Sequence, residues 1–284
     1  MTPVVVAAVL AAALAHASWN ALAHGIRDQL TAFSLVGGGG AVCGAVLVCF
    51  APVPAAGAWP ALLVSVVLHV IYQILLMRSF GLGDFGQMYP IARGTAPLVV
   101  TVLAAVFLHE LPDAWQLAGV ALASAGLLGV ALWGIRGKSG QRPQWPALTA
   151  AVATGLAIAS YTTVDGVGVR ASGSPLGYIA WLMVLQGALI PAYAFAVRGR
   201  ALAGLLRPVA VRGLVGGALS VAAYGLVLWA QTKAPLAPVA ALRESSIIAG
   251  AAFGALFFKE RFGAPRVIAS ALMVGGIALM LHSS

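Results

Sequence analysis

An arginine at position 93 interrupts an apolar part of the chain, within the sequence GQMYPIARGTAP at residues 86–97. A second arginine, Arg243, lies in another apolar stretch and is followed directly by Glu244. The planar guanidinium group of arginine can bind a carboxylate through two parallel hydrogen bonds, which a lysine ammonium group cannot do. Arg93 and Arg243 are therefore candidates for binding a carboxylate, either that of Glu244 in a fixed ion pair or that of a bound small molecule.

Polar and aromatic side chains also recur at spacings of three and four residues, which place them on one face of a helix. Amide, imidazole and hydroxyl groups can bind polar groups, and aromatic rings can bind a cation such as an ammonium group. Combined with the arginines, they predict a cavity for a zwitterion, and amino acids fit this chemistry best. The residues assigned to the cavity are His16, Trp19, Asn20, His69, Tyr72, Gln73, Tyr89, Arg93, Tyr161, Thr162, Tyr224, Arg243 and Glu244. Ser220 lies on one of these faces, and Asp165 and Gln231 are expected on them near the outer mouth.

These residues also have a purely structural interpretation. Buried histidine, asparagine and threonine can hydrogen-bond between helices at about 0.6 kcal/mol each, and tryptophan and tyrosine can anchor helix ends at a membrane interface. An interfacial role does not account for Trp19 and Tyr72, which are predicted near mid-membrane. For the two arginines, the structural alternative is an ion pair with Glu244 or extension towards the near interface.

Other chemistry is not indicated by the motifs of the chain. There is no metal-ligand cluster, phosphate-binding glycine-rich loop or nucleotide-hydrolysing motif, so no metal, cofactor or catalytic residue is assigned and ATP drive is not expected. The two cysteines, Cys43 and Cys49, are six residues apart on one predicted helix and point to different faces, which argues against a disulfide. Proton coupling through His16, His69 or Glu244 and uncoupled transport are both compatible with the sequence.

Long apolar runs must position these side chains. The chain is 61% hydrophobic and only 8% charged, with a mean hydropathy of +0.99, whereas a soluble chain is about 25% charged. Each run has the roughly 20 residues that cross a ~30 Å hydrocarbon core as a helix, and the linkers between runs are short. Ten membrane-spanning helices are predicted, at residues 3–24, 31–50, 58–80, 86–107, 113–135, 146–167, 175–197, 209–230, 237–257 and 264–282.

The net charge of +9 is distributed unequally between the two sides of the membrane. Twelve of the 16 basic residues lie in the loops that follow odd-numbered spans, and only Arg170 and Lys233 lie in the other loops. Basic loops remain in the cytoplasm, so both termini are expected in the periplasm of a bacterial inner membrane. Nucleic acid is not an expected partner, because the basic residues are neither clustered with aromatic residues nor carried by a soluble module.

The second half of the chain repeats the first. A shift of 150 residues pairs Arg93 with Arg243 and Glu110 with Glu260, and a shift of 142 aligns LAHASWN (14–20) with LAIASYT (156–162). The predicted domains are residues 1–140 and 141–284. Since each contains five helices, an odd number, the second repeat is inverted relative to the first. Inverted repeats place a binding site near the midplane between the halves and permit alternating access, with one arginine expected towards each mouth.

Three stretches carry a resemblance to a known family: HASWNAL (16–22), VFLHELPDAWQLAGVALASAGLLG (106–129) and LAPVAALRESSIIAGAAFGALFFKERFGAPRVIASALMVGGIALML (236–281). In these the chain resembles the EamA type of the drug/metabolite transporter superfamily, and its ten-helix layout is similar to that of YddG-type bacterial amino-acid exporters. The resemblance implies an inner-membrane carrier, not an enzyme, with a central cavity lined by both halves. It also implies that Glu110 and Glu260 cap helix ends.

The sequence thus predicts an all-α polytopic membrane protein that exports amino acids or similar small zwitterionic metabolites by alternating access. A multidrug or other amphipathic-metabolite exporter of the same superfamily is the main alternative, and a non-transporting scaffold or a membrane-embedded enzyme is more remote. The expected partners are the small-molecule substrate and membrane lipid. Small residues predict closely packed helix seams that are compatible with a homodimer; they are Gly37 to Gly40, Gly44, Ala121, Ala125 and Gly129.

Overall fold

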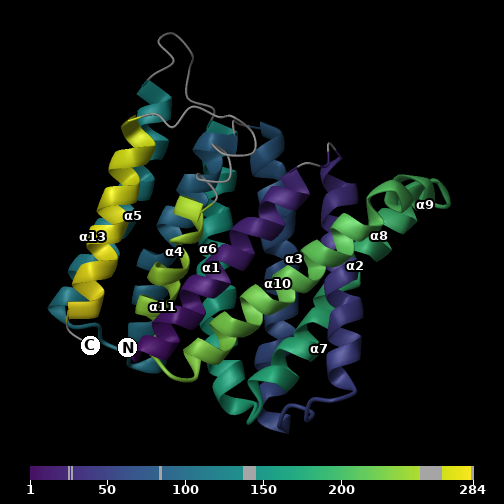
Figure 1. The fold of residues 1–284 in the computed structure, drawn as a ribbon, viewed down its shortest axis with the longest axis horizontal. Coiled ribbons are helices and arrows are strands. Elements are labelled where there is room, and N and C mark those ends of the chain that lie inside the picture. The colour runs from purple at the N-terminus through teal and green to yellow at the C-terminus, as the bar shows by residue number, and fades with distance from the viewer. Residues whose placement is uncertain (25, 27, 83–84, 137–144, 250–263, 283–284) are drawn as a thin grey trace.

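The structure, a computed structural model, describes the chain except for residues 25, 27, 83–84, 137–144, 250–263 and 283–284 (Figure 1). The described residues form helices and no strands. The α-helices are α1 (Pro3–His24), α2 (Gln29–Val48), α3 (Trp59–Leu82), α4 (Phe85–Leu108), α5 (Ala114–Arg136), α6 (Trp145–Ala171), α7 (Pro175–Gly187), α8 (Leu189–Arg198), α9 (Ala201–Leu206), α10 (Ala210–Gln231), α11 (Leu236–Arg243) and α13 (Ala264–His282). Two short 3₁₀ helices, Ala56–Ala58 and Arg207–Val209, precede α3 and α10.

The predicted membrane-spanning character is confirmed. Within the described residues, seven segments are long and apolar enough to cross a membrane. They are Pro3–Ala23, Gln29–Val48, Ala56–Arg78, Ile91–Leu108, Trp145–Ala171, Pro175–Arg198 and Ala201–Gln231. Shorter apolar helices, Ala114–Gly129 and Val267–His282, lie within α5 and α13. The protein is therefore an all-α polytopic membrane protein, whose lipid-facing backbone is satisfied within each helix.

Two of the predicted helices are not continuous. The span predicted at 175–197 is divided at Ala188 into α7 and α8. The span predicted at 237–257 is interrupted after Arg243, where the backbone N–H groups of Glu244 and Ser245 bond carbonyls three residues back. Helical structure resumes at residues 246–249, and the remainder of that span lies outside the described residues. An interrupted helix is tolerated at membrane depth only where it is buried in protein or lines a cavity.

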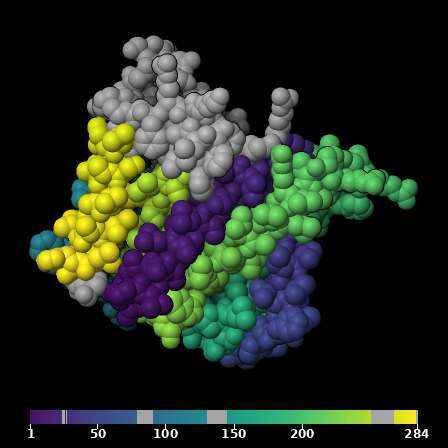
Figure 2. Space-filling view, in the orientation of Figure 1, coloured from purple at the N-terminus to yellow at the C-terminus, as the bar shows by residue number. Residues whose placement is uncertain are grey.

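The two halves pack through equivalent pairs of helices. Under the predicted repeat, α1 corresponds to α6, α3 to α10, α2 to α7 with α8, and α5 to α13. In the structure α1 packs on α10, the equivalent α6 packs on α3, α2 packs on α7 and α5 packs on α13. Figure 2 shows α1 and α10 lying side by side across one face. These are the contacts that a pseudo-two-fold axis between two repeats would produce, although the boundary between residues 140 and 141 remains a prediction.

Glycines permit two of these crossings to be close. A Cβ added at Gly187 of α7 would lie 2.5 Å from the carbonyl oxygen of Gly37 in α2, and one added at Gly276 of α13 would lie 2.5 Å from that of Gly119 in α5. The backbones of the paired helices are therefore in contact, as small-residue interfaces in membranes allow. The predicted glycine seam of α2 thus packs within the chain.

The seam predicted on α5 is a different case. Its three residues, Ala121, Ala125 and Gly129, are exposed, and the contact of α5 with α13 is made by Gly119 and other residues of the opposite face. This face therefore makes no close crossing within the described residues, and its role as a packing seam, compatible with a homodimer, stays a prediction.

The molecule has two distinct ends (Figure 1). Helix α1 begins and α13 ends at one of them, which we call the terminus end. Helices α8 and α9 lie at the opposite end, where Arg198, Arg200 and Arg207 are found, and we call it the basic end. Helix α2 begins at the basic end and α7 begins at the terminus end. The position of a residue along its helix therefore shows which of the two ends it lies nearer.

Candidate functional site

A cavity opens between the two halves of the molecule. Its lining comes from six helices, α1, α2 and α3 of the first half and α6, α7 and α10 of the second. The lining residues are His16, Trp19, Phe33, Val36, Gly37, Gly40, His69, Tyr72, Gln73, Tyr161, Met183, Gln186, Gly187, Ser220 and Tyr224. A site at the interface of two halves is where a carrier built from repeats binds its substrate.

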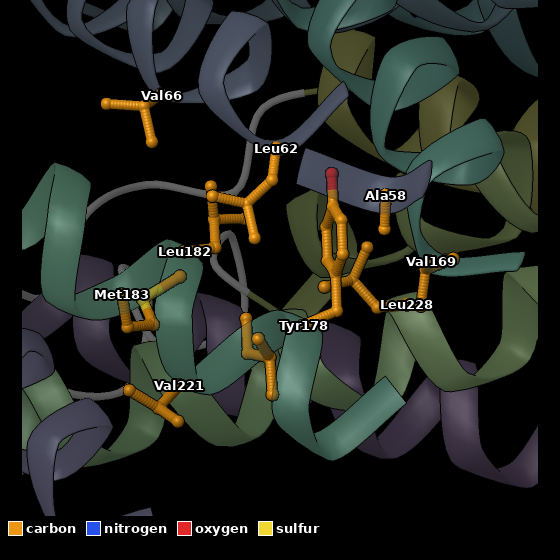
Figure 3. Packing of buried hydrophobic residues seen from close by; sticks show 10 residues of the cluster. Ala58, Leu62, Val66, Val169, Tyr178, Leu182, Met183, Val221 and Leu228 are labelled. Atoms are coloured by element: carbon orange, nitrogen blue, oxygen red, sulfur yellow. The ribbon is translucent and has the colours of Figure 1, made fainter. Parts of the chain in front are cut away.

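The cavity lies in the basic half of the molecule. Phe33 and Gly37 belong to the first half of α2, which begins at the basic end, and Gln186 is near the end of α7, which begins at the terminus end. Towards the terminus end, a buried apolar cluster fills the space between the halves. Figure 3 shows Tyr178 of this cluster beside Leu62, Ala58 and Leu228. The cavity therefore lies nearer the basic end, and apolar side chains fill the space towards the terminus end.

One wall of the cavity is a continuous set of aromatic rings. The imidazole of His69 stacks on Tyr161, with centroids 4.0 Å apart and an interplanar angle of 27°. Tyr72 and Tyr224 meet Tyr161 edge-on, at 5.5 Å and 6.1 Å. These π-faces can attract a cation such as the ammonium group of a zwitterion.

His16 connects the cavity to a buried charged cluster. Arg93 places Nη1 3.5 Å from His16 Nε2 and donates from Nη2 to Ser246 Oγ at 3.1 Å. Its Nε lies 2.6 Å from Glu244 Oε2, and Arg243 Nε lies 3.9 Å from the other oxygen of the same carboxylate. Arg93, Arg243 and Glu244 are only 2%, 4% and 1% exposed. Two guanidinium groups thus approach one carboxylate directly behind the cavity wall.

This arrangement corrects one expectation and leaves another open. The arginines do not extend towards opposite mouths, because both side chains meet at Glu244. The fixed ion pair that the sequence allowed is present in this conformation. Neither arginine lines the open cavity, and His16 separates Arg93 from it.

His16 itself has two polar neighbours. Trp19 Nε1 lies 3.2 Å from His16 Nδ1, on the side of the ring opposite to Arg93. A neutral imidazole has only one acceptor nitrogen, so the contacts to Trp19 and Arg93 are not both hydrogen bonds at one time.

A second buried group surrounds Asp165 of α6, which is fully buried. Its carboxylate accepts hydrogen bonds from Tyr178 Oη at 2.9 Å and from Tyr224 Oη. On α3, Ser65 Oγ lies 3.1 Å from His69 Nδ1, and both residues are within interaction range of Asp165. Asp165 is thus attached to the cavity wall through Tyr224 and to the apolar cluster of the terminus end through Tyr178.

The structure brings together most, but not all, of the residues assigned from sequence. His16, Trp19, His69, Tyr72, Gln73, Tyr161 and Tyr224 line the cavity. Asn20 instead donates to the backbone carbonyl of His16 at 2.8 Å, and Thr162 is fully buried away from the cavity. The side chain of Tyr89 lies outside the described residues.

Some participants were not among the residues assigned to the cavity. Asp165 was recognised on the helix face of Tyr161, four residues away, but was not assigned to the cavity. Met183 and Gln186 line the cavity from α7, and Ser246 binds Arg93. Their own sequence segments show no polar-aromatic pattern, so their roles depend on how the helices pack.

Glu110 joins three segments at the terminus end. Its carboxylate accepts from Arg170 Nη1 at 2.5 Å and from the backbone N–H of Leu236 at 2.8 Å, where α11 begins. Arg170 also donates to the carbonyls of Gln231 and Ala234. Glu110 therefore caps a helix, in agreement with the implication of the resemblance, whereas Glu260 lies outside the described residues.

Metal binding finds no support in the described part of the chain, where no group of three His, Cys, Asp or Glu side chains is arranged to hold an ion.

The fold defines a polytopic helical membrane protein with a cavity between its two halves. Residues 145–282, from α6 to α13, match the EamA-like transporter family, so the second half of the chain carries an EamA-like transporter domain. This domain indicates a membrane protein of the drug/metabolite transporter type.

The remaining comparisons add the fold alone. No curated protein matches the chain in sequence. One solved crystal structure superposes with a TM-score of 0.73 over 98% of this chain and 99% of its own, at 18% sequence identity. The similarity covers both halves, so the architecture outside residues 145–282 is also shared with that structure.

Proposed function

We propose that this protein is a secondary carrier of a bacterial inner membrane that exports amino acids or similar small zwitterionic metabolites by alternating access. The observation that carries the proposal is the pairing of Arg93 and Arg243 with a single carboxylate, Glu244, directly behind His16 of the cavity wall. Charged groups at membrane depth are held by partners of opposite charge, and two guanidinium groups at one carboxylate offer donors to a second anionic partner. A substrate carboxylate would supply that partner.

The aromatic wall accounts for the other end of a zwitterion. The faces of Tyr161, Tyr72 and His69 line the same cavity as His16. An ammonium group held against these rings would gain about 0.5–2 kcal/mol from cation–π attraction. Carboxylate and ammonium would then bind to two different helix groups, which gives the cavity a preferred substrate orientation.

The direction of transport follows from the distribution of charge. The basic end would face the cytoplasm under the positive-inside rule, and the cavity lies in that half of the molecule, whereas the terminus end is filled by apolar side chains. Substrate would therefore enter from the cytoplasm, and rearrangement of the two halves would open the terminus end to the periplasm.

Counterflow in proteoliposomes tests the proposal. Proteoliposomes that contain the purified protein are preloaded with each of a panel of amino acids and, separately, with the matching amines that lack the carboxylate. Wild-type protein should exchange amino acids, and Arg243→Lys should lose affinity for them by about tenfold, or roughly 1.4 kcal/mol, while amines are little affected. Lysine keeps the charge but loses the bidentate geometry. Arg207→Lys, an exposed arginine at the basic end, is the matched control.

Two results would overturn the proposal. One is an absence of counterflow with every amino acid tested, and the other is equal affinity of Arg243→Lys and wild type for amino acids.

A multidrug exporter is the second candidate, and the aromatic wall favours it. Rings from α3, α6 and α10 form a broad apolar surface that would suit amphipathic cations. In that case lipophilic cations would be exchanged in preference to amino acids, and substitution of Arg243 by lysine would leave their affinity unchanged.

A further inference from the structure

Asp165 is a buried carboxylate that the proposed substrate chemistry does not use. It is fully buried in α6, and in the part of the chain that the structure describes no ion pair includes it. Its hydrogen-bond donors are the neutral hydroxyls of Tyr178 and Tyr224. A carboxylate without a cationic partner is costly to bury in an apolar environment, and a carboxyl group can avoid that cost by binding a proton.

The groups around Asp165 come from four helices. The titratable groups that face it are His69 of α3, Tyr178 of α7, Tyr224 of α10 and Tyr161 of its own helix. Ser65 of α3 adds a hydroxyl donor.

The charged cluster lies farther away. Arg243 is within electrostatic range of His69 and Tyr224, and Glu244 is within electrostatic range of Tyr161. Neither forms an ion pair with Asp165, so its surroundings are dipolar apart from the imidazole.

A hydrogen-bonded route joins Asp165 to the cavity. Tyr224 Oη is hydrogen-bonded to the Asp165 carboxylate, and Tyr224 also lines the cavity in the basic half of the molecule. A proton on Asp165 can therefore pass to Tyr224 Oη as this hydroxyl gives its own proton to cavity water, so that the tyrosine stays neutral.

The donors of Asp165 belong to the region that closes the terminus end. Tyr178 packs in the apolar cluster there, against Leu62 and Leu228 (Figure 3). A Cβ added at Gly168 would lie 2.5 Å from Tyr178 Oη, so this ring is fitted closely against α6. Opening of the terminus end requires α7 and α10 to move relative to α6, which would withdraw the tyrosine hydroxyls from Asp165.

We propose that Asp165 is a proton-binding site whose occupancy alternates with the opening of the terminus end, which makes the carrier a proton antiporter. This inference rests on the proposed transport function. When the terminus end opens, the carboxylate loses its two tyrosine donors and takes a proton from outside. When that end closes, the hydroxyls bind the carboxylate again, and the proton leaves through the Tyr224 hydroxyl to the cavity. One proton enters for each transport cycle.

Transport in proteoliposomes provides the first test. With the terminus side acidic, wild-type protein should transport substrate against its gradient towards that side. Asp165→Asn should abolish this pH-driven transport and retain counterflow at near wild-type rate, because exchange needs no net proton movement. Asp113→Asn, an exposed carboxylate at the start of α5, is the matched control and should behave as wild type. Equal pH-driven transport by Asp165→Asn and wild type would overturn the proposal.

Infrared difference spectroscopy of the purified protein separates this inference from the transport function. A pH jump should produce the C=O stretching band of a protonated carboxyl in wild type and in Glu244→Gln, and Asp165→Asn should lack it. Tyr178→Phe keeps the carboxyl but removes one donor, so the protonated band should persist to higher pH. If Asp165→Asn does not fold, Tyr178→Phe provides the test in its place. A band that is unchanged in both variants overturns the proton site, whatever the substrate. Absence of counterflow in wild type would instead refute only the proposed substrate.

Discussion

Arg93 of α4 and Glu244, in the turn that ends α11, form a buried ion pair with Nε and Oε2 2.6 Å apart. The pair joins a continuous helix of the first half to an interrupted helix of the second half. The chain leaves α-helical geometry at the residue that carries the carboxylate, because Glu244 bonds a carbonyl three residues back. The interruption therefore places Glu244 between two guanidinium groups instead of along the regular helix surface.

Removal of this carboxylate should make the fold dependent on substrate. In Glu244→Gln the two arginines would lack their shared anion, and breaking one side of a buried pair typically costs about 3–5 kcal/mol. We expect a lower melting temperature in detergent than for wild type. Saturating amino acid should restore more of the loss than the matching amine restores, since only the amino acid supplies a carboxylate. An equal stabilisation of both proteins by amino acid would contradict this role.

The cavity assignment predicts different effects for two tryptophans. Trp19 lines the cavity, whereas Trp59 begins α3 at the terminus end, where its ring packs on Trp181 and its Nε1 donates to Pro54 O. Trp19→Ala should change the relative counterflow rates of amino acids with large and small side chains, at normal expression. Trp59→Ala should leave these ratios unchanged. Small and equal effects of both variants would indicate that Trp19 packs against its neighbours and does not contact the substrate.

The helices were largely predictable from the sequence because apolar runs of membrane length have few alternatives. The span predicted at 3–24 is α1, and the one predicted at 113–135 differs from α5 by one residue at each end. The interruptions at Ala188 and Glu244 were not predicted. They depend on contacts between halves, namely the close approach of Gly187 to α2 and the charged cluster, which no local pattern reports.

The candidate site was predictable to the extent that helix periodicity defines it. Residues spaced by three or four, such as His16 with Trp19 and His69 with Tyr72, do share one cavity. Burial was less predictable, since the enclosure of Asp165 by Tyr178 and Tyr224 was not expected. Burial depends on which helices cover a residue, and that information comes only from tertiary packing.

The crossing of α5 and α13 should be sensitive to a single methyl group. Gly276→Ala would place its Cβ 2.5 Å from the carbonyl oxygen of Gly119, which forces the two backbones apart. Gly129→Ala, on the exposed face of α5, meets no atom within 4 Å and serves as the control. Alanine otherwise favours a helix over glycine by about 1 kcal/mol, so Gly129→Ala should not lower the melting temperature. We expect a lower melting temperature for Gly276→Ala alone. Thermal stability measured by size-exclusion chromatography distinguishes the two, and wild-type stability of Gly276→Ala would refute the crossing.

An ion pair at the basic end should contribute stability that depends on pH. Asp28 caps α2 by accepting from the backbone N–H of Leu30, and it also pairs with Arg198 at the end of α8. The hydrogen bond from Arg198, aided by Thr31, lowers the pKa of Asp28 from 3.8 to about 2. Because the folded pKa is depressed, the stabilisation is fully present above pH 4 and is lost as the pH falls towards 2.

Asp28→Asn tests this dependence, since asparagine retains a capping oxygen but carries no charge. The variant should melt below wild type at pH 7, and the difference should shrink as the pH is lowered from 4 towards 2. Asp113 also caps a helix, by accepting from the backbone N–H of Gln116, so the Asp113→Asn variant serves for comparison. A difference in melting temperature that stays constant over this range would show that the charge of Asp28 does not stabilise the fold.

The orientation in the membrane determines which side receives the substrate, and it can be tested with two engineered cysteines. The native thiols are first removed by Cys43→Ala and Cys49→Ala, because Cys49 is exposed. Ala56 is exposed at the terminus end before α3, and Ala203 is exposed in α9 at the basic end. If the basic end is cytoplasmic, Ala56→Cys should react in intact cells with a maleimide that cannot cross the inner membrane, and Ala203→Cys should react only after the cells are opened. Labelling of Ala203→Cys alone in intact cells would reverse the orientation, and the described cavity would then face the periplasm and favour uptake over export.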